Sequence, residues 1–440
     1  MDYFYRKVDY ALQQWRTEKY RKPLMLRGAR QIGKTTAIRY LGKQFAHFLE
    51  INFENKDHSI AKTVFEQHSD PHIICSELSA LFGKPIVAGE TLLFLDEVQE
   101  CPDAISSLRF FYENLPELHV VAAGSLLEFA LEEIPSFGVG RIESIFMYPF
   151  SFNEFLCAIG LEMWAKLIDD ATPEKPISDA IHGKILEQLK NFLIIGGMPE
   201  VVAEFVRTGD LLRCQKILNN LLVAFRNDFA KYKKRIPGTW INEVFSSIAQ
   251  QVEGKFIYEK VSQSLRNEQV KKSLELLLMA GLCYRVTHTS AEGIPLGATI
   301  NTKYQRIIPF DTGIYQRILN LDISNILLSD DFDTINKGAV AEIFVGCELK
   351  KHADRYSDSE LYCWVREKKG SSAQIDFVVQ RNETILPIEV KSGKQGKMQS
   401  MWIFLEEKKL NNGIRTSLEN FSTYNNIQVY PLYAIGNILH

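Results

Sequence analysis

The sequence lacks three features that would each assign a class of protein at once: a strong charge of one sign, paired cysteines and long apolar runs. A net charge of -3 at pH 7 gives no chain-wide field to draw the protein to nucleic acid or to an anionic membrane. Any contact with DNA would therefore need a local basic patch. No apolar run approaches the roughly 20 residues of a membrane-spanning helix, so no membrane partner is expected.

The seven cysteines stand singly, without a Cys-x-x-Cys pair and without histidines at zinc-ligand spacing. A dispersed, odd-numbered set is typical of reduced, buried thiols. Residues 1–22 are charged throughout and lack the apolar core of a signal peptide, and their pattern predicts an amphipathic helix. We therefore expect a cytoplasmic protein. Its 440 residues exceed what one hydrophobic core holds, so two to four domains are expected.

A glycine-rich segment near the amino terminus has the composition of a phosphate-binding loop. Residues 23–27 (PLMLR) fit a buried parallel strand, the sequence GARQIGKTT follows at once, and a helical pattern starts at Thr35. The pattern G-x-x-x-x-G-K-[ST] is complete, and its glycines let backbone N–H groups face phosphates. Lys34 would reach the β- and γ-phosphates of ATP, and the Thr35 hydroxyl would bind magnesium. The residues expected to bind nucleotide are Gly28, Ala29, Arg30, Gln31, Ile32, Gly33, Lys34, Thr35 and Thr36.

A second apolar run, residues 91–100 (TLLFLDEVQE), ends in two carboxylates. Ligands bind at the carboxyl ends of strands in open α/β sheets, and this run predicts a strand that delivers Asp96 and Glu97 there. Asp96 fits a magnesium ligand, and Glu97 fits the general base that polarises the attacking water. Together with the loop, this pair predicts a site for ATP and Mg²⁺.

Two further polar residues are candidates for nucleotide contacts. Ser125 follows the apolar run HVVAAG and either senses the γ-phosphate or caps the helix expected over residues 126–133. Arg141 precedes another strand-like run and is either a surface charge or an arginine finger. Whether such a finger would act within the chain or on a neighbouring copy in a homo-oligomer stays open.

The order of segments GARQIGKTT, LLFLDE, AAGS, MYPFSFNEFL and GGMPEVV resembles a large family of bacterial and archaeal AAA-type ATPases, akin to replication-initiator ATPases. The resemblance covers nearly the whole chain, and residues 149–155 and 196–202 are its most specific parts. It implies an α/β fold: a five-stranded P-loop domain (1–150), a helical lid (151–237), a winged-helix segment (238–302) and a domain resembling PD-(D/E)XK restriction endonucleases (303–440).

The middle of the chain reads as helical. Residues 240–251, 257–265 and 268–280 predict three helices, residues 281–290 a strand and residues 295–300 a returning strand, which together are the recipe of a winged helix. The last helix offers lysines balanced by glutamates, so the module is either DNA-binding or purely architectural. The most basic short run, residues 228–235, reads as a solvated helix face or a linker.

The carboxyl-terminal part contains a set of residues typical of metal-dependent nucleases. An amphipathic helix over 338–350 carries Glu342, a later strand carries Asp376, and the next strand places Glu389 and Lys391 on one face. An aspartate in a buried strand is costly unless it is paired or binds a cation. Asp376 and Glu389, either alone or with Glu342, would bind one or two Mg²⁺ ions, and Lys391 would position or deprotonate water or offset developing charge.

Activity is a separate question from fold. Asp376, Glu389 and Lys391 are either catalytic or an internal ion-pair group in a packed domain. Three functions follow: an ATPase whose nucleotide state controls a nuclease acting on DNA, a nucleotide-gated switch that binds DNA or protein with a dead nuclease domain, and a nuclease for which the ATPase fold is an assembly scaffold.

Overall fold

A computed structural model describes residues 3–125, 127, 128, 131, 140–230, 236–321, 337–366, 373–391 and 398–439. By packing, the chain divides into two units. The first contains Met1–Tyr148, Met279–Gly281 and Asp354–Asp358, and the second contains Pro149–Leu278, Leu282–Ala353 and Ser359–His440. In the described part of the chain, no helix has both the length and the apolarity to span a membrane.

The first unit is built on five parallel strands in the order β2-β3-β4-β1-β5. Their bounds are β1 Leu24–Arg27, β2 His47–Asn52, β3 Thr91–Asp96, β4 His119–Ala123 and β5 Glu143–Phe146. Strands β3 and β4 are buried along their whole length, as expected for the centre of a parallel sheet covered on both faces. The five-stranded core expected from the sequence is confirmed.

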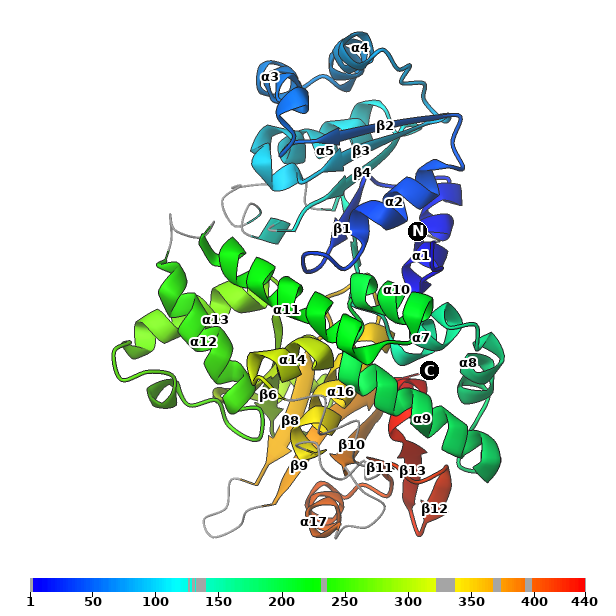
Figure 1. The fold of residues 1–440 in the computed structure, drawn as a ribbon, viewed down its shortest axis with the longest axis vertical. Coiled ribbons are helices and arrows are strands. Elements are labelled where there is room, and N and C mark those ends of the chain that lie inside the picture. Colours follow the sequence, from blue (N-terminus) through cyan, green and yellow to red (C-terminus); the bar gives the residue numbers. More distant parts are fainter. Residues whose placement is uncertain are drawn as a thin grey trace. The chain divides into compact units, whose positions relative to one another are not determined.

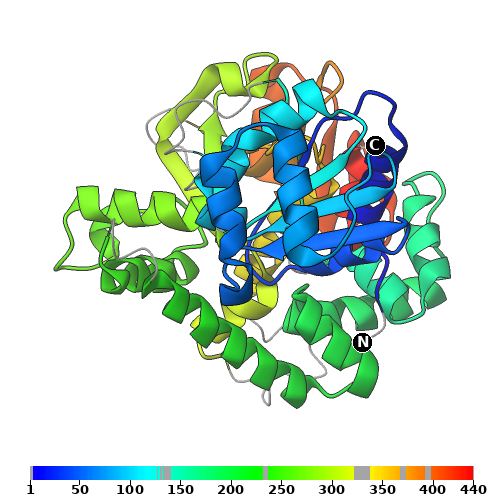
Figure 2. The same cartoon turned by 90° about the horizontal axis from the view of Figure 1, so that it is seen from above.

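Helices cover this sheet on both faces (Figures 1 and 2). Their bounds are α1 Lys7–Thr17, α2 Lys34–Gly42, α3 Ile60–Gln67, α4 Pro71–Phe82 and α5 Pro102–Asn114. Apolar side chains of α3, α4 and α5 form one core with side chains of β1–β4. Helix α2 packs against β3 and β4 and against α1, which is the amphipathic helix predicted for the amino terminus. Both α2 and the loop before it are thereby fixed to the centre of the sheet.

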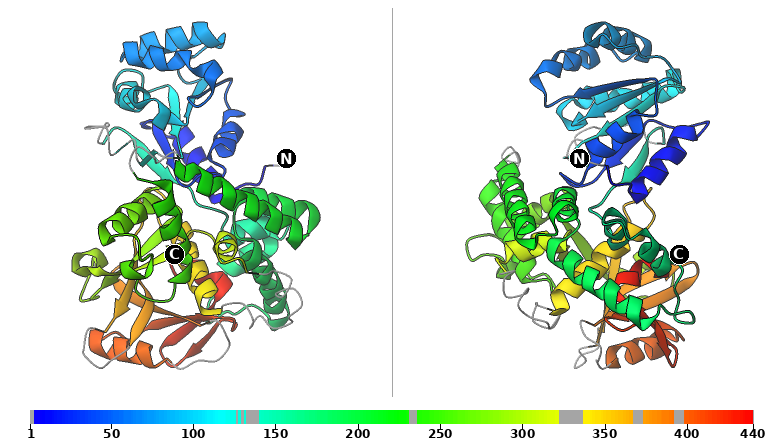
Figure 3. Two further views of the ribbon diagram at one scale, coloured as in Figure 1. Left: turned by 60° about the vertical axis from the view of Figure 1, so that its left-hand side comes forward. Right: turned by 45° about the vertical axis from the view of Figure 1, so that its right-hand side comes forward.

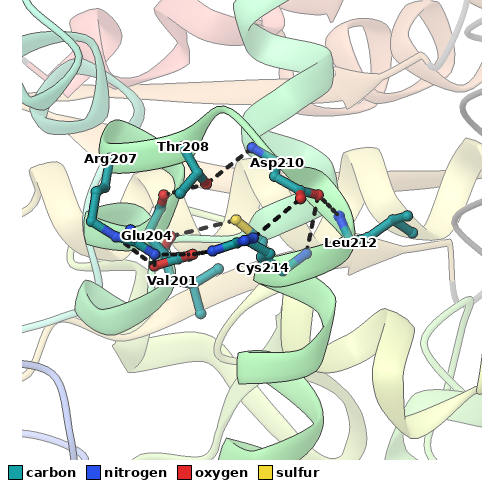
Figure 4. A network of polar contacts seen from close by, with 8 residues as sticks. Val201, Glu204, Arg207, Thr208, Asp210, Leu212 and Cys214 are labelled. Carbon is teal, nitrogen blue, oxygen red and sulfur yellow. Dashed lines mark hydrogen bonds and ion pairs between the residues drawn. The ribbon is translucent and has the colours of Figure 1, made fainter.

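The second unit begins with five helices, α7 Phe152–Ala158, α8 Glu162–Asp169, α9 Asp179–Ile195, α10 Pro199–Thr208 and α11 Leu211–Asp228. Figure 4 shows the turn between α10 and α11, where Asp210 caps α11 by accepting hydrogen bonds from the N–H groups of Leu212 (2.9 Å) and Arg213 (3.2 Å). Glu204 on α10 pairs with Arg207 (2.7 Å) beside this turn. The helical character predicted for this region is confirmed.

A mixed sheet forms the rest of the second unit, in the order β12-β13-β11-β10-β9-β8-β6-β7 (Figures 1 and 3). Its strands are β6 Cys283–Thr289, β7 Ile300–Pro309, β8 Leu361–Val365, β9 Gln374–Arg381, β10 Thr384–Val390, β11 Gly413–Ser417, β12 Ser422–Tyr424 and β13 Ile427–Pro431. Helix α16 (Lys337–His352) packs against β7, β8 and β10, and helix α17 (Gln399–Lys408) packs against β9 and β10. The strands expected to carry Asp376 and Glu389 are confirmed as β9 and β10.

Three elements expected in the middle of the chain differ from the structure. Residues 257–265 form only a 3-10 turn at Tyr258–Lys260, although helices α12 (Gly238–Gln250) and α13 (Asn267–Met279) match their predictions. Residues 295–300 do not form the returning strand, because Leu296–Thr299 is a 3-10 turn and the strand begins at Ile300. The expected boundary at 302/303 falls inside β7, which pairs with β6, while β6 pairs in turn with β8.

The two segments most specific to the resemblance contact each other, and one of them contacts a buried carboxylate. Asp311, which caps helix α14 (Thr312–Ile318), accepts hydrogen bonds from the N–H groups of Gly197 (2.7 Å) and Ile314 (3.0 Å). The Phe150 N–H donates to the carbonyl oxygen of Gly197 at 2.7 Å. A side chain at Gly196 would overlap the Asp311 carboxylate, and its φ is +72°. The glycines of this segment are therefore explained by packing in the second unit.

Two predictions fall on residues that the structure does not describe. The basic run 228–235 lies outside the described residues from position 231 onward, and the helix that Ser125 was expected to cap lies largely outside them. Their structure stays a prediction.

Candidate functional site

The carboxyl ends of β1, β2, β3 and β4 bring the predicted nucleotide residues to one edge of the first sheet. In the register of these strands Asn52 lies beside Asp96, and Asp96 lies beside Ala123. The loop that follows β1 begins at the same edge, since Leu26 also lies beside Ala123. The polar residues that follow these apolar strands therefore lie at the same edge of the sheet.

The loop over residues 28–33 has the backbone of a phosphate cradle. Gly28, Gln31 and Gly33 have φ values of +135°, +61° and +99°, so the chain curls before α2 starts at Lys34. Ile32 is buried in the core, while Gln31 points to solvent. Successive N–H groups in such a loop and at a helix start attract anions.

Lys34 lies inside this loop and is buried. Its ammonium group donates hydrogen bonds to the carbonyl oxygens of Gly28 (2.8 Å) and Ala29 (2.7 Å). Burial lowers the pKa of Lys34 to about 8, against the raising effect of Glu97 and Asp96. A cation held inside a ring of backbone groups is placed to bind phosphate oxygens.

Asp96 connects the loop to the neighbouring strands. Its Oδ2 atom accepts hydrogen bonds from the Thr35 hydroxyl (3.1 Å) and from the side-chain amide of Asn52 (3.2 Å). Burial, with the adjacent Glu97 charge, raises the pKa of Asp96 to about 6. A hydroxyl and a carboxylate side by side are oxygen donors of the kind that Mg²⁺ prefers.

Glu97 takes an unusual backbone conformation for its residue type, with φ +49°. Non-glycine residues in this region store strain and cluster at functional sites. Its Oε2 atom accepts hydrogen bonds from the Gln99 amide (2.8 Å) and from the hydroxyl and N–H of Ser125 (3.0 and 3.3 Å). Burial alone would raise the pKa of Glu97, but these hydrogen bonds and the charges of Arg30 and Lys34 hold it below its usual value.

Arg141 does not reach this edge. It precedes β5 and is ion-paired with Glu113 near the end of α5, at the amino ends of the strands, because β5 runs parallel to β1. A contact of Arg141 with nucleotide in its own chain is therefore not supported. Of the other predicted loop residues, Arg30 lies 3.4 Å from Glu54, and Thr36 is exposed on the first turn of α2.

Gly28→Ala is expected to weaken nucleotide binding by roughly tenfold or more. A methyl group at Gly28 would overlap the carbonyl oxygen of Met147, and its φ disfavours any side chain, so the loop must shift. Dissociation constants for ADP measured by titration calorimetry test this.

Gly89→Ala is the matched control, because Gly89 has φ +81° with open space around its Cβ position. It should cost about 1 kcal/mol of stability and leave ADP affinity unchanged. Equal losses of affinity in the two variants would show that strain, and not the loop, determines binding.

Affinity for Mg²⁺-ADP is expected to be highest between about pH 6 and about pH 8. Phosphate binds the protonated form of Lys34, so affinity falls as pH rises through the pKa of this lysine. The metal binds the ionised form of Asp96, so affinity falls as pH drops through the pKa of this carboxyl. Titrations across this range test both limbs, and Lys34→Arg should remove only the alkaline limb because arginine stays protonated. An unchanged alkaline limb in that variant would exclude Lys34 as its source.

The second unit brings Asp376, Glu389 and Lys391 together. The antiparallel register of β9 and β10 pairs Phe377 with Ile388, which places Asp376 opposite Glu389. Asp376 Oδ2 accepts a hydrogen bond from the Val390 N–H (2.8 Å), and Lys391 pairs with Glu389 Oε1 at 2.6 Å. Burial raises the pKa of both carboxyl groups.

A register shift between β8 and β9 changes the direction of the Asp376 side chain. Tyr362 of β8 pairs with Val378, but Trp364 pairs with Ile375, so Asp376 and Phe377 together face the single residue between them on β8. Such a bulge turns a side chain away from the ordinary alternation of a strand. The sequence pattern alone could not show it.

Glu342 takes a different partner from the one expected. It forms an ion pair with Arg306 of β7, whose guanidinium also donates to the carbonyl oxygen of Asp376 at 3.2 Å. Among the residues with described positions, no group of three or more His, Cys, Asp or Glu could hold a metal ion. Glu342 is therefore engaged by Arg306, which also contacts Asp376, and a group of three acidic ligands is not observed among the described residues.

Sequence reasoning missed Asn52, Gln99 and Arg306. Asn52 ends a strand-like run, and Gln99 lies two residues after Glu97, so both carried the signal of a polar residue at a strand end. Arg306 stands beside the apolar residues of β7, where a charged side chain signals a buried partner.

Comparison with known proteins identifies the first unit. Residues 20–156 match the model of a family described as an AAA domain, and with the loop geometry above they form an AAA-type P-loop ATPase domain. Residues 186–325 and 337–435 match the models of two families described as domains of unknown function, DUF8612 and DUF4143. No curated protein matches the chain.

Several solved structures are similar to this chain. One is a Walker-type ATPase of Pyrococcus abyssi, with 14% identity, a TM-score of 0.45, and coverage of 73% of this chain and 97% of that one. Another is the Orc1 protein of Aeropyrum pernix in complex with DNA, with 12% identity, a TM-score of 0.26, and coverage of 73% and 92%. A third is Cdc6p of Pyrobaculum aerophilum, with 12% identity, a TM-score of 0.24, and coverage of 71% and 92%.

Proposed function

We propose that the chain hydrolyses ATP in its first unit and uses the nucleotide state to control a nuclease-like module, residues 303–440, that acts on DNA. The observation that carries the proposal is the meeting of the phosphate loop with Asp96 and Glu97 at one edge of a parallel sheet. The seven cysteines, all free thiols, support a reducing compartment, the cytoplasm.

Each residue at this edge would have a separate role in ATP hydrolysis. Lys34 and the loop N–H groups would bind the phosphates, and Thr35 and Asp96 would hold magnesium. When bound, magnesium offsets the charge that develops on the transferred phosphoryl group. Glu97 would accept the proton of the attacking water at a carboxylate oxygen, while Ser125 holds its other oxygen.

The carboxylates of the second unit fit a divalent cation. Glu389 Oε2 is buried and has no hydrogen-bond partner, which leaves a charged oxygen unsatisfied beside Asp376. Asp376 and Glu389 would hold Mg²⁺ or Mn²⁺, which when bound stabilises charge on a phosphodiester. Lys391, about a quarter exposed, would position or deprotonate the attacking water.

Two observations favour a second candidate, a nucleotide-gated switch that binds DNA or a partner protein with an inactive nuclease-like site. Arg306 forms an ion pair with Glu342, and Lys391 forms an ion pair with Glu389. Such pairs are typical of a group of charges that serves structure. In either case residues 151–237 would act as a helical lid. Within residues 238–302, helix α13 exposes Lys271 and Lys272 and would provide the contact with DNA.

Cleavage of plasmid and linear DNA with Mg²⁺ or Mn²⁺, with and without ATP, tests the proposal. We expect cleavage by the unmodified chain, its loss in Lys391→Ala, and its preservation in Lys303→Ala, which removes an exposed lysine of β7. ATP turnover is followed in the same samples.

The outcomes separate the candidates. Cleavage that changes with ATP and is altered in Lys34→Ala supports control by nucleotide, whereas cleavage that persists unchanged in Lys34→Ala indicates a scaffold with its own nuclease. ATP turnover without cleavage under any metal condition favours the switch. Unchanged ATP affinity and turnover in Lys34→Ala would contradict the ATPase assignment.

A further inference from the structure

Arg306 is a buried cation inside the carboxylate group of the second unit. Its side chain is 4% exposed, and it forms an ion pair with Glu342 while its other terminal nitrogen lies 4.0 Å from Asp376 Oδ1. Moving a guanidinium out of water costs several kcal/mol unless opposite charges compensate. Arg306 is therefore held in place by the acids that the sequence assigns to metal binding.

The oxygens of these acids are not equally engaged. Glu342 Oε2 is taken by Arg306, Asp376 Oδ2 accepts from the Val390 N–H, and Glu389 Oε1 is paired with Lys391. Glu389 Oε2 has no hydrogen-bond partner among the described residues, and Asp376 Oδ1 lies 4.0 Å from a terminal nitrogen of Arg306. These two oxygens belong to residues that lie opposite each other on β9 and β10, where facing Cβ atoms are about 4.5–5.5 Å apart, so one ion could be held between them.

The balance of charge also limits how many cations this group of residues can bind. When all three acids are ionised, Glu342, Asp376 and Glu389 carry one more negative charge than Arg306 and Lys391 offset. Arg415, which faces Glu389 from β11, is matched by Glu419 at 3.6 Å. A second divalent ion beside Glu342 would have to approach a buried guanidinium in a medium of low dielectric constant, where like charges repel strongly.

We propose that Arg306 takes the place of a second metal ion and limits the nuclease-like site to one divalent cation, held by Asp376 and Glu389. This rests on the metal site of the proposed function. Arg306 acts as a positioning residue: it neutralises Glu342 and fixes the backbone of Asp376 through its carbonyl oxygen. A site so built has one metal-bound position for a phosphodiester oxygen.

Binding of Mn²⁺ to the nucleotide-free full chain, counted by the loss of the free-ion signal in electron paramagnetic resonance, tests this. The count of interest is the number of sites that Glu389→Gln removes, so ions held elsewhere in the chain do not enter. We expect one such site in the unmodified chain and one in Arg306→Lys, which keeps the charge. For Arg306→Gln the total number of bound ions is compared with that of the unmodified chain; it should rise by one, and this added site should be lost in Arg306→Gln/Glu342→Gln.

The outcomes test the role of Arg306 and the existence of the metal site separately. Two Glu389-dependent sites in the unmodified chain, or an unchanged count in a folded Arg306→Gln, would overturn the role of Arg306 and leave the metal site standing. No Glu389-dependent site at all would overturn the metal site itself. If Arg306→Gln unfolds, the unmodified chain and Arg306→Lys still decide by their counts, and recovery of the Arg306→Gln fold by Mn²⁺ would support the freed acid as a ligand.

Discussion

Glu97→Gln is expected to lower ATP turnover by about 100-fold or more while nucleotide affinity stays within about threefold. Glutamine keeps the shape of Glu97 and can accept the same hydrogen bonds from Ser125 and Gln99, but its amide does not take a proton from water. Steady-state phosphate release and ADP titrations on the same preparation measure the two quantities.

Glu100→Gln is the control for this substitution. Glu100 lies three residues later and is exposed, so the same change of charge is made without touching the carboxylate beside the phosphate loop. Its turnover should equal that of the unmodified chain. If Glu97→Gln also keeps full turnover, the base is another group, and Glu97 only holds Ser125 and Gln99 in place.

Much of the nucleotide site could be predicted because its information is local. The strand, loop and helix around Lys34 are consecutive in the sequence, and a strand that ends in Asp96 and Glu97 needs only the rule that ligands bind at carboxyl ends. Asn52 is different, because its contact with Asp96 depends on β2 lying beside β3 in register. The position of Arg141 has the same origin, because it follows from the direction of β5 and not from its neighbours in sequence.

The second unit shows where sequence reasoning ends. Its strands were found from their composition, and the order of Asp376, Glu389 and Lys391 predicted their meeting. That β6 and β7 extend the same sheet was not predicted, because strand pairing over long sequence separations leaves no local signal. The role of Arg306 follows from this pairing. The two units also differ in how the strands that carry their site residues pair: β3 and β4 are parallel and buried, whereas β9 and β10 are antiparallel.

The residues around Asp311 illustrate a different limit. The segment GGMPEVV is specific to the resemblance, and the need for glycine at position 196 follows from the Asp311 carboxylate that lies against it. Burial raises the pKa of Asp311, against the lowering effect of the N–H groups that it accepts from and of Lys351. A motif that is specific to a resemblance can thus serve packing alone.

Asp311→Ala is expected to destabilise the second unit by about 2–4 kcal/mol, because it removes two hydrogen bonds to a charged group and leaves the Gly197 N–H buried without a partner. Urea unfolding followed by tryptophan fluorescence measures this, since four of the five tryptophans lie in the second unit: Trp164, Trp240, Trp364 and Trp402. ATP affinity in the first unit should not change.

Asp210→Ala provides the matched control, because Asp210 also caps a helix with its carboxylate but is partly exposed. Water can replace a cap at a surface, so its loss should cost only about 1 kcal/mol. If both substitutions cost the same, Asp311 acts as an ordinary cap and its contact with Gly197 adds nothing. A larger cost for Asp311 would show that its buried carboxylate, through the contact with Gly197, contributes more to stability than an ordinary helix cap does.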